Sequence, residues 1–187
     1  MKVTSRVLAL AALVAAAPAG AVEYGKVLPE KSEIRFVSRQ MNVPVEGSFR
    51  KFDVQLSFDP AKPESGSTRI TVHLAGIDAG SDEANAEART KGWFDTPRFP
   101  TATFASTRVK PLGPNRYEVA GTLTIKGRSR DVVAPVSFRQ DGANAVLEGS
   151  FVVKRLQFAI GEGPWSDVET VADDVQVRFR VTASPVK

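Results

Sequence analysis

Hydrophobic and polar residues alternate along most of the chain from Ser32 onward. Residues 175–182 show this most clearly, since every second residue there is Val or Phe and the others are polar or charged. A period of two places alternate side chains on opposite faces of a β-strand. Turn signals such as Asp141-Gly142 separate the runs. The pattern predicts about eight antiparallel strands, which is typical of a barrel or a sandwich.

One segment after the third predicted strand departs from this alternation and has the features of a short helix. Ser81 is placed to cap its start, and Asp82 and Glu83 suit the positive end of the helix dipole. Gly92 stands where a C-terminal cap belongs. We therefore predict one helix of about ten residues (~15 Å), followed by an aromatic and proline-rich stretch, residues 93–100, that seals one side or end of the barrel.

The interior of an eight-stranded barrel is either filled by side chains or holds one ligand, and alternation alone does not separate the two. The aromatic residues are eleven Phe, two Trp and two Tyr, so most large inward groups carry no polar atom. Small residues at inward positions, such as Gly121 and Ala134, leave volume free. These features favour an apolar ligand, and a filled barrel remains the alternative.

The composition argues against an enzyme. The chain has no Cys and one His, which excludes disulfides, Cys-ligated metal sites and thiol catalysis. A His-rich metal site or a Ser-His-Asp triad is not expected, and no phosphate-binding loop or nucleophile-elbow motif is found. We expect no catalytic residues, no metal site and no cofactor required for chemistry.

Residues 1–21 read as a secretory signal peptide. Lys2 and Arg6 precede an apolar run of eleven residues, Val7–Ala17, and Ala19-Gly20-Ala21 fits a cleavage site. Removal of this segment leaves 23 basic and 21 acidic residues in residues 22–187, a net charge of +2. That charge is too small for a nucleic-acid partner. We predict one domain, residues 22–187, located in the periplasm.

Five motifs in order resemble the YceI-like, polyisoprenoid-binding family. They are Ser32-Glu33-Ile34-Arg35-Phe36, Gly47–Phe52 with Leu56–Asp59, Trp93-Phe94-Asp95 with Phe99-Pro100 and Phe104–Ser106, Gly121–Gly127, and Arg155–Gly163 with Trp165. The resemblance implies a mostly β, eight-stranded antiparallel lipocalin-like barrel with one short α-helix after the third strand. It also implies a long isoprenoid ligand, polyprenyl or quinone-type, and a cytochrome b561-type membrane protein as a partner.

The predicted apolar lining of the ligand site comes from inward strand positions and from the aromatic stretch after the helix. It consists of Ile34, Phe36, Phe58, Val72, Leu74, Trp93, Phe94, Phe104, Leu123, Ile125, Phe158 and Phe179.

Arg155 is the candidate for binding the ligand's polar head. Residues on either side of Lys154-Arg155 alternate with opposite phase, as at a β-bulge. A bulge can turn Arg155 toward the cavity mouth, where its N–H donors would bind a phosphate or polarise a quinone carbonyl. The alternative is a solvated arginine at a bulge.

A second basic group lies on a predicted hairpin tip. Lys126, Arg128 and Arg130 would make transient contact with an anionic membrane surface during ligand transfer. The alternative is an ordinary solvated turn.

Taken together, the sequence predicts a periplasmic protein that binds and carries a long isoprenoid lipid inside an apolar barrel. Two alternatives remain open at this point. One is a scavenger of other hydrophobic amphiphiles such as antibiotics, and the other is a filled barrel that acts as a protein-interaction module.

Overall fold

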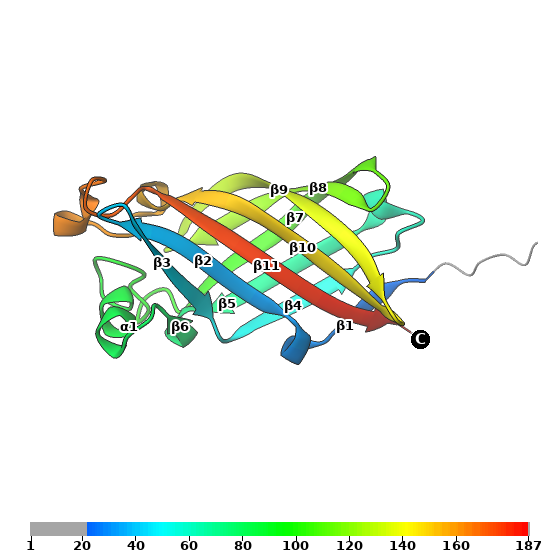
Figure 1. The fold of residues 1–187 in the computed structure, drawn as a ribbon, viewed down its shortest axis with the longest axis horizontal. Helices are drawn as coiled ribbons and strands as arrows, with labels where there is room; N and C mark the ends of the chain where they lie inside the picture. Colours follow the sequence, from blue (N-terminus) through cyan, green and yellow to red (C-terminus); the bar gives the residue numbers. More distant parts are fainter. Residues whose placement is uncertain (1–21, 187) are drawn as a thin grey trace, which may run out of the picture.

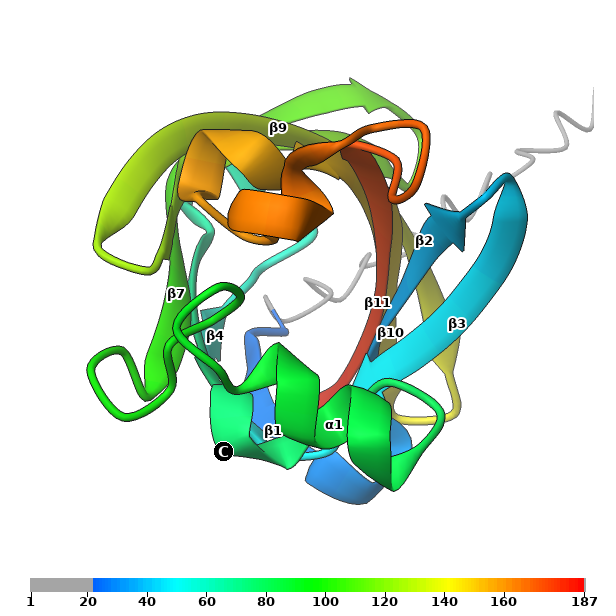
Figure 2. The same ribbon diagram turned by 90° about the vertical axis from the view of Figure 1, so that its left-hand side faces the viewer.

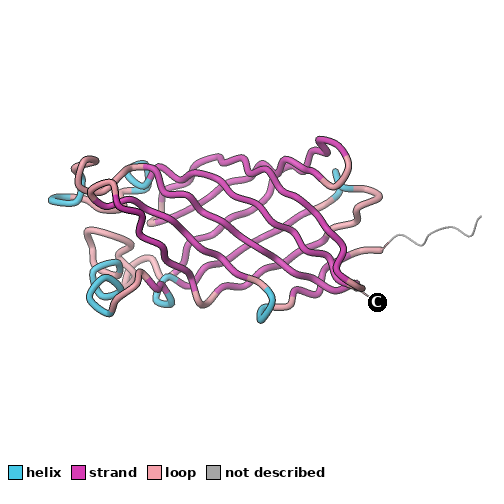
Figure 3. The backbone as a smooth tube through the Cα atoms, in the orientation of Figure 1, coloured by secondary structure: helices cyan, strands magenta, loops and turns pink. Residues whose placement is uncertain are grey.

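A computed structural model describes residues 22–186, in which eleven strands form one antiparallel sheet that curls around a long axis (Figure 1, Figure 3). The expected signal peptide, residues 1–21, lies outside the described residues. The strands are β1 (Tyr24–Val27), β2 (Glu33–Gln40), β3 (Val43–Phe49), β4 (Phe52–Ser57), β5 (Ser67–His73), β6 (Ile77–Asp78), β7 (Thr101–Gly113), β8 (Arg116–Ile125), β9 (Arg128–Asp141), β10 (Asn144–Lys154) and β11 (Asp174–Pro185).

The predicted count of eight strands is wrong, and the extra strands have identifiable origins. β1 and β6 are four and two residues long, too short for an alternating pattern to reveal. β3 and β4 are separated by Arg50-Lys51 and pair with different neighbours, β2 and β5. The helix accordingly follows the sixth strand rather than the third.

The sheet order β4-β5-β7-β8-β9-β10-β11-β2-β3-β6 would leave β4 at one edge, and β1 connects that edge to the other side of the sheet. β1 pairs with β11, and Tyr24 exchanges two backbone hydrogen bonds of 2.8 and 3.0 Å with Phe58, just after β4. We call this region the β1 end. At the opposite, helix end lie α1 (Asp82–Ala88) and the turns of residues 155–166 (Figure 2).

The start of α1 is as predicted and its end is not. The Ser81 hydroxyl accepts a hydrogen bond from the Ala84 amide at 3.1 Å, which confirms the N-terminal cap. The helix stops at Ala88 because Thr90 begins a series of turns, in which its carbonyl accepts from two later amides. The C-terminal cap is therefore Arg89 and the assignment of Gly92 was wrong. Among the described residues, no helix has the length and apolar character to cross a membrane.

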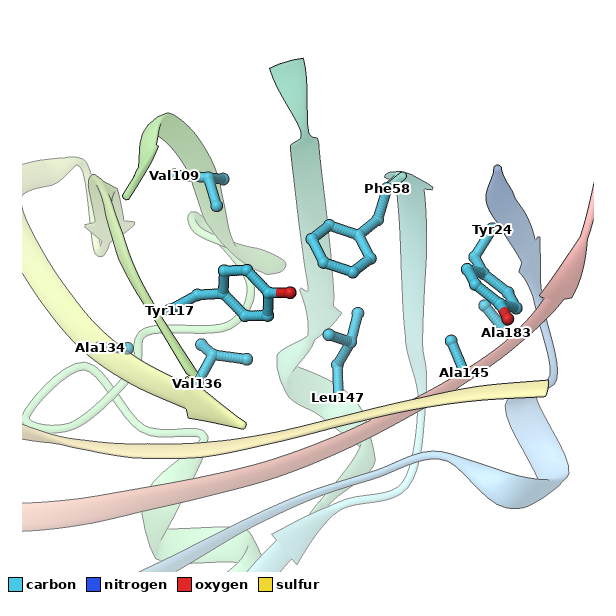
Figure 4. Close-up of a cluster of buried hydrophobic side chains, with 9 residues drawn as sticks. All are labelled: Tyr24, Phe58, Val109, Tyr117, Ala134, Val136, Ala145, Leu147 and Ala183. Carbon is cyan, nitrogen blue, oxygen red and sulfur yellow. The ribbon is translucent and has the colours of Figure 1, made fainter. Parts of the chain in front are cut away.

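Two clusters of buried side chains form the core. One lies at the β1 end and is drawn in Figure 4: Tyr24, Phe58, Val109, Tyr117, Ala134, Val136, Ala145, Leu147 and Ala183. The other lies toward the helix end: Leu74, Ala102, Leu123, Ile125, Val153, Phe158 and Ile160.

Candidate ligand-binding cavity

The curled sheet encloses a cavity of about 640 Å³, within the range of small-molecule sites. Its wall is largely apolar, because most inward positions of the strands are Val, Ile, Leu or Phe. Eleven of the twelve predicted lining residues lie on this wall: Ile34, Phe36, Phe58, Val72, Leu74, Trp93, Phe94, Phe104, Leu123, Ile125 and Phe179. The members of this set on strands lie where alternation placed them, even though the strand count was wrong, whereas Trp93 and Phe94 come from the stretch after the helix.

Phe158 is the predicted lining residue that does not reach the cavity. It lies in a 3₁₀ turn, Arg155–Phe158, and packs in the core cluster at the helix end, 2 % exposed. The predicted strand through residue 160 ends at Lys154. Alternation with a period of two therefore does not predict which way the side chains of the following turn, Arg155–Phe158, point.

Three phenylalanine rings on the wall each lie over a glycine of the neighbouring strand. The pairs are Phe36 over Gly47, Phe104 over Gly121 and Phe179 over Gly149. A Cβ atom at Gly121 would overlap the ring of Phe104 and crowd the carbonyl of Ala105. Because glycine has no side chain, each ring can lie against the backbone of the neighbouring strand. The expectation that Gly121 leaves free volume needs correcting, since Phe104 covers it.

At the β1 end, aromatic packing borders the cavity. The rings of Phe58 and Tyr117 meet edge-on with centroids 5.2 Å apart, and both residues lie on the wall. Burial raises the pKa of the Tyr117 phenol, so it is neutral across the physiological range. This end of the wall presents rings and hydroxyls and no charge.

At the helix end, one face of α1 forms part of the wall. Glu83, Ala84, Glu87 and Ala88 share this face because residues four apart in a helix lie above one another. Oε1 of Glu87 accepts a hydrogen bond from the indole N–H of Trp93 at 3.1 Å. The cavity reaches the surface here, since Glu83 is exposed.

The same oxygen of Glu87 accepts a second hydrogen bond, from the indole of Trp165 at 2.9 Å. The two indole rings lie 5.8 Å apart. Glu87 and Trp165 were missed by the sequence analysis, because they come from distant segments and neither lies on a strand. The sequence places Trp165 at the end of the fifth motif and Glu87 four residues after Glu83 on a predicted helix, but neither signal links the two residues.

A family model described as "YceI-like domain" matches residues 26–183, nearly all of the described chain. The chain belongs to the YceI-like family. A UPF0312 protein of Azotobacter vinelandii is 31% identical over 171 residues, which cover 86% of this chain and 88% of that protein. The family match thus extends over almost the whole of the curled sheet.

Solved structures of similar proteins have the same architecture. The crystal structure of BcnA from Burkholderia cenocepacia is 43% identical, with a TM-score of 0.83, and the match covers 85% of this chain and 100% of that one. A polyisoprenoid binding domain from Saccharophagus degradans has a TM-score of 0.67 at 15% identity, covering 89% and 99% of the two chains. At that identity the second likeness is one of fold.

Arg155 of this YceI-like chain is not available to bind a ligand head. Its side chain is 1 % exposed and donates to five backbone carbonyls at 2.6–3.0 Å. The acceptors are the carbonyls of Ile160, Gly161, Trp165, Val171 and Ala172. An arginine has five N–H donors, so none is left. Burial lowers the pKa of Arg155, while the Asp173 charge opposes this.

The prediction of a headgroup role for Arg155 was therefore wrong, and so was the alternative of a solvated arginine. The change of phase near Lys154 has a cause other than a bulge: β10 ends there and a 3₁₀ turn begins. Arg155 instead fastens together the turns of residues 155–172, which form one side of the helix end.

The side chain of Lys126 is also largely buried and binds groups of the protein itself. Its ammonium donates to the carbonyls of Lys91 and Ala159 at 2.8 and 2.7 Å and to the Glu162 carboxylate at 2.9 Å. Its side chain is 8% exposed. Lys126 is therefore not free to make the predicted contact with a membrane surface. Arg128 and Arg130 of the same hairpin tip are exposed. Among residues 22–186, no group of three His, Cys, Asp or Glu side chains is arranged to hold a metal ion.

Proposed function

We propose that this protein binds a long isoprenoid lipid in its cavity and carries it through the periplasm, with no catalysed reaction. The observation that supports this most is the apolar cavity of about 640 Å³, whose wall combines eleven lining positions expected from the sequence. A void of this size is not expected in a barrel filled for stability alone. The cavity thus argues against the filled barrel as a protein-interaction module.

Burial of the tail supplies the affinity in this proposal. Apolar surface removed from water contributes roughly 25 cal/mol per Å², so about 300 Å² of buried tail contributes about 7 kcal/mol before ordering costs. The rings that lie along the wall present broad apolar faces to such a chain. No polar interaction is required to hold the tail.

Two further observations support the proposed ligand class and the proposed location of the protein in the periplasm. The Saccharophagus degradans neighbour is called a polyisoprenoid binding domain, and we extend that ligand class to this family member. The signal-peptide pattern of residues 1–21 supports the periplasm. If the cargo is a quinone, a cytochrome b561-type membrane protein is the partner we propose.

A charged residue placed on the wall tests the proposal. Leu123 lines the cavity, and Thr124 is the next residue of the same strand with its side chain on the opposite face. We expect Leu123→Asp to weaken binding of an added isoprenoid quinone at least about tenfold, because a carboxylate would stand against the tail. Thr124→Asp is the matched control and should bind like the wild type.

Binding is followed by quenching of tryptophan fluorescence, since both tryptophans of the chain, Trp93 and Trp165, lie on the wall. Circular dichroism verifies that each variant is folded. Leu123→Asn, which carries no charge, replaces Leu123→Asp if that variant does not fold. Wild-type affinity in a folded variant at position 123 would contradict the proposed site.

A further inference from the structure

The charged groups of the cavity wall that remain open to a ligand are carboxylates. Within the described residues the side chains on the wall that are charged at neutral pH are Glu83, Glu87 and Arg155. Arg155 has no donor left, because its five N–H groups bind backbone carbonyls. The other polar wall groups are neutral, such as the Gln40 amide and the hydroxyls of serine, threonine and tyrosine. A ligand therefore meets two carboxylates at the helix end and no cation with a free donor.

Glu87 is held in a fixed position and keeps one oxygen uncommitted. The indoles of Trp93 and Trp165 both donate to Oε1, from two segments that are distant in the sequence. Among residues 22–186, Oε2 of Glu87 has no hydrogen-bond donor, so it can accept one from a bound molecule. A carboxylate held by two donors needs little reordering when a ligand arrives.

Glu83 adds a second negative charge one turn earlier on the same face of α1. Its own backbone amide and then the Ser81 hydroxyl lower the pKa of Glu83, so it is ionised at neutral pH. Two basic side chains of the helix end have other partners: Arg89 donates to the Ala75 carbonyl, and Lys126 donates to two carbonyls and Glu162. The carboxylates on the wall are thus not neutralised by these residues.

We propose that, between apolar molecules with the same tail, the cavity favours one whose polar end is an uncharged hydroxyl over one that ends in phosphate. Glu87 is the specificity-determining residue, because its free oxygen can accept a hydrogen bond from the hydroxyl. A phosphate end has no cation to receive it and is repelled by two carboxylates in a site partly shielded from water. The inference rests on the proposed function, since it concerns the polar end of a molecule whose tail fills the cavity.

The experiment compares two ligands that share one tail, farnesol and farnesyl diphosphate. Affinities are measured at low salt by tryptophan quenching and checked by equilibrium dialysis, which does not depend on the tryptophan signal. We expect the wild type to bind farnesol at least about tenfold more tightly than the diphosphate. Glu87→Gln should reduce this ratio about threefold or more, because it removes the charge and keeps the shape of the side chain.

Glu64→Gln is the matched control, because it removes an exposed carboxylate beyond β4, near the β1 end, and gives the same total charge. It should leave the ratio unchanged. Equal affinities for the two ligands in the wild type, or tighter binding of the diphosphate, would overturn the inference while the proposed function stands. An unchanged ratio in folded Glu87→Gln would overturn the role of Glu87. If the wild type binds neither ligand and no isoprenoid quinone, the proposed function itself fails.

Discussion

The two ends of the curled sheet are held together in different ways. At the β1 end, aromatic rings and small residues pack closely, and Ala145 and Ala183 have no exposed surface. At the helix end, single polar side chains join segments that are distant in the sequence. Arg155 binds five carbonyls, Lys126 joins three segments, and Glu87 joins two indoles.

Backbone strain follows the same division. Non-glycine residues with positive φ angles are concentrated at the helix end: Met41, Asn42, Asp95, Lys126 and Ala159. Asn115, in the turn between β7 and β8, is the one such residue toward the β1 end within residues 22–186. A left-handed conformation costs about 1 kcal/mol or more for a residue with a side chain. The end that contains the proposed ligand entrance is therefore the one that departs most from regular structure.

Among the substitutions considered, Arg155→Met should lower the free energy of unfolding the most. The substitution leaves five carbonyls around a buried site without their donors, so we expect it to lower the free energy of unfolding by at least about 3 kcal/mol. Lys154→Met is the control, because the neighbouring Lys154 is half exposed and pairs with Asp174 on the surface; its cost should stay below about 1 kcal/mol. Urea denaturation measures both. Similar costs for the two variants would show that Arg155 does not hold this end together.

A smaller effect is expected in the wall that joins the two ends. Gly121→Ala places a methyl group against the Phe104 ring and the Ala105 carbonyl, which should cost about 1–3 kcal/mol. It should also weaken binding of an isoprenoid quinone, because a displaced Phe104 ring would change the shape of the cavity that it lines. At Gly92 the nearest atom to an added methyl is 3.9 Å away, so Gly92→Ala should be within about 0.5 kcal/mol of the wild type. Equal stability of the two variants would mean that the ring does not depend on the glycine.

The smallest effect concerns the Lys126–Glu162 pair. The hydrogen bond from Lys126, and then its charge, lower the pKa of Glu162. A lowered carboxyl pKa stabilises the folded state above the unfolded value, about 4.3, and this contribution is lost as the pH falls through the folded value. Because Glu162 is half exposed, Glu162→Gln should cost less than about 1 kcal/mol at pH 7.

Thermal unfolding at pH 7 and pH 3 tests the sign. The difference in Tm between the wild type and Glu162→Gln should be smaller in acid, because the wild-type carboxyl gives up its charge as the pH falls toward its lowered pKa. A difference that grows in acid would contradict the assignment of the pKa shift to this pair.

The sequence was informative where strands are regular and misleading where they stop. Alternation placed residues such as Phe104 and Leu123 on the wall, because the period of two fixes the face of each side chain. It failed for Phe158 and Arg155, since a 3₁₀ turn produces the same change of phase as a bulge. The strand count failed at Arg50-Lys51, where the chain passes from one partner strand to another.

The helix end was also the part of the site least accessible from the sequence. Glu87 accepts a hydrogen bond from the indole of Trp165, which lies 78 residues later in the chain. Neither segment contains a local pattern that predicts this contact. The left-handed conformation of Ala159 follows from the turn that Arg155 organises, and alanine is not a residue that signals it. Long-range polar contacts of this kind are set by the folded structure as a whole, whereas the face of a strand residue is set locally.

The central claim is that the interior of this sheet is a site for an apolar guest. The most direct test is organic extraction and mass spectrometry of the protein purified from its native cells. We expect a polyprenyl or quinone-type lipid in near-stoichiometric amount, lost on purification of folded Leu123→Asp. A wild-type protein that yields no lipid and takes up no added isoprenoid quinone would contradict the claim.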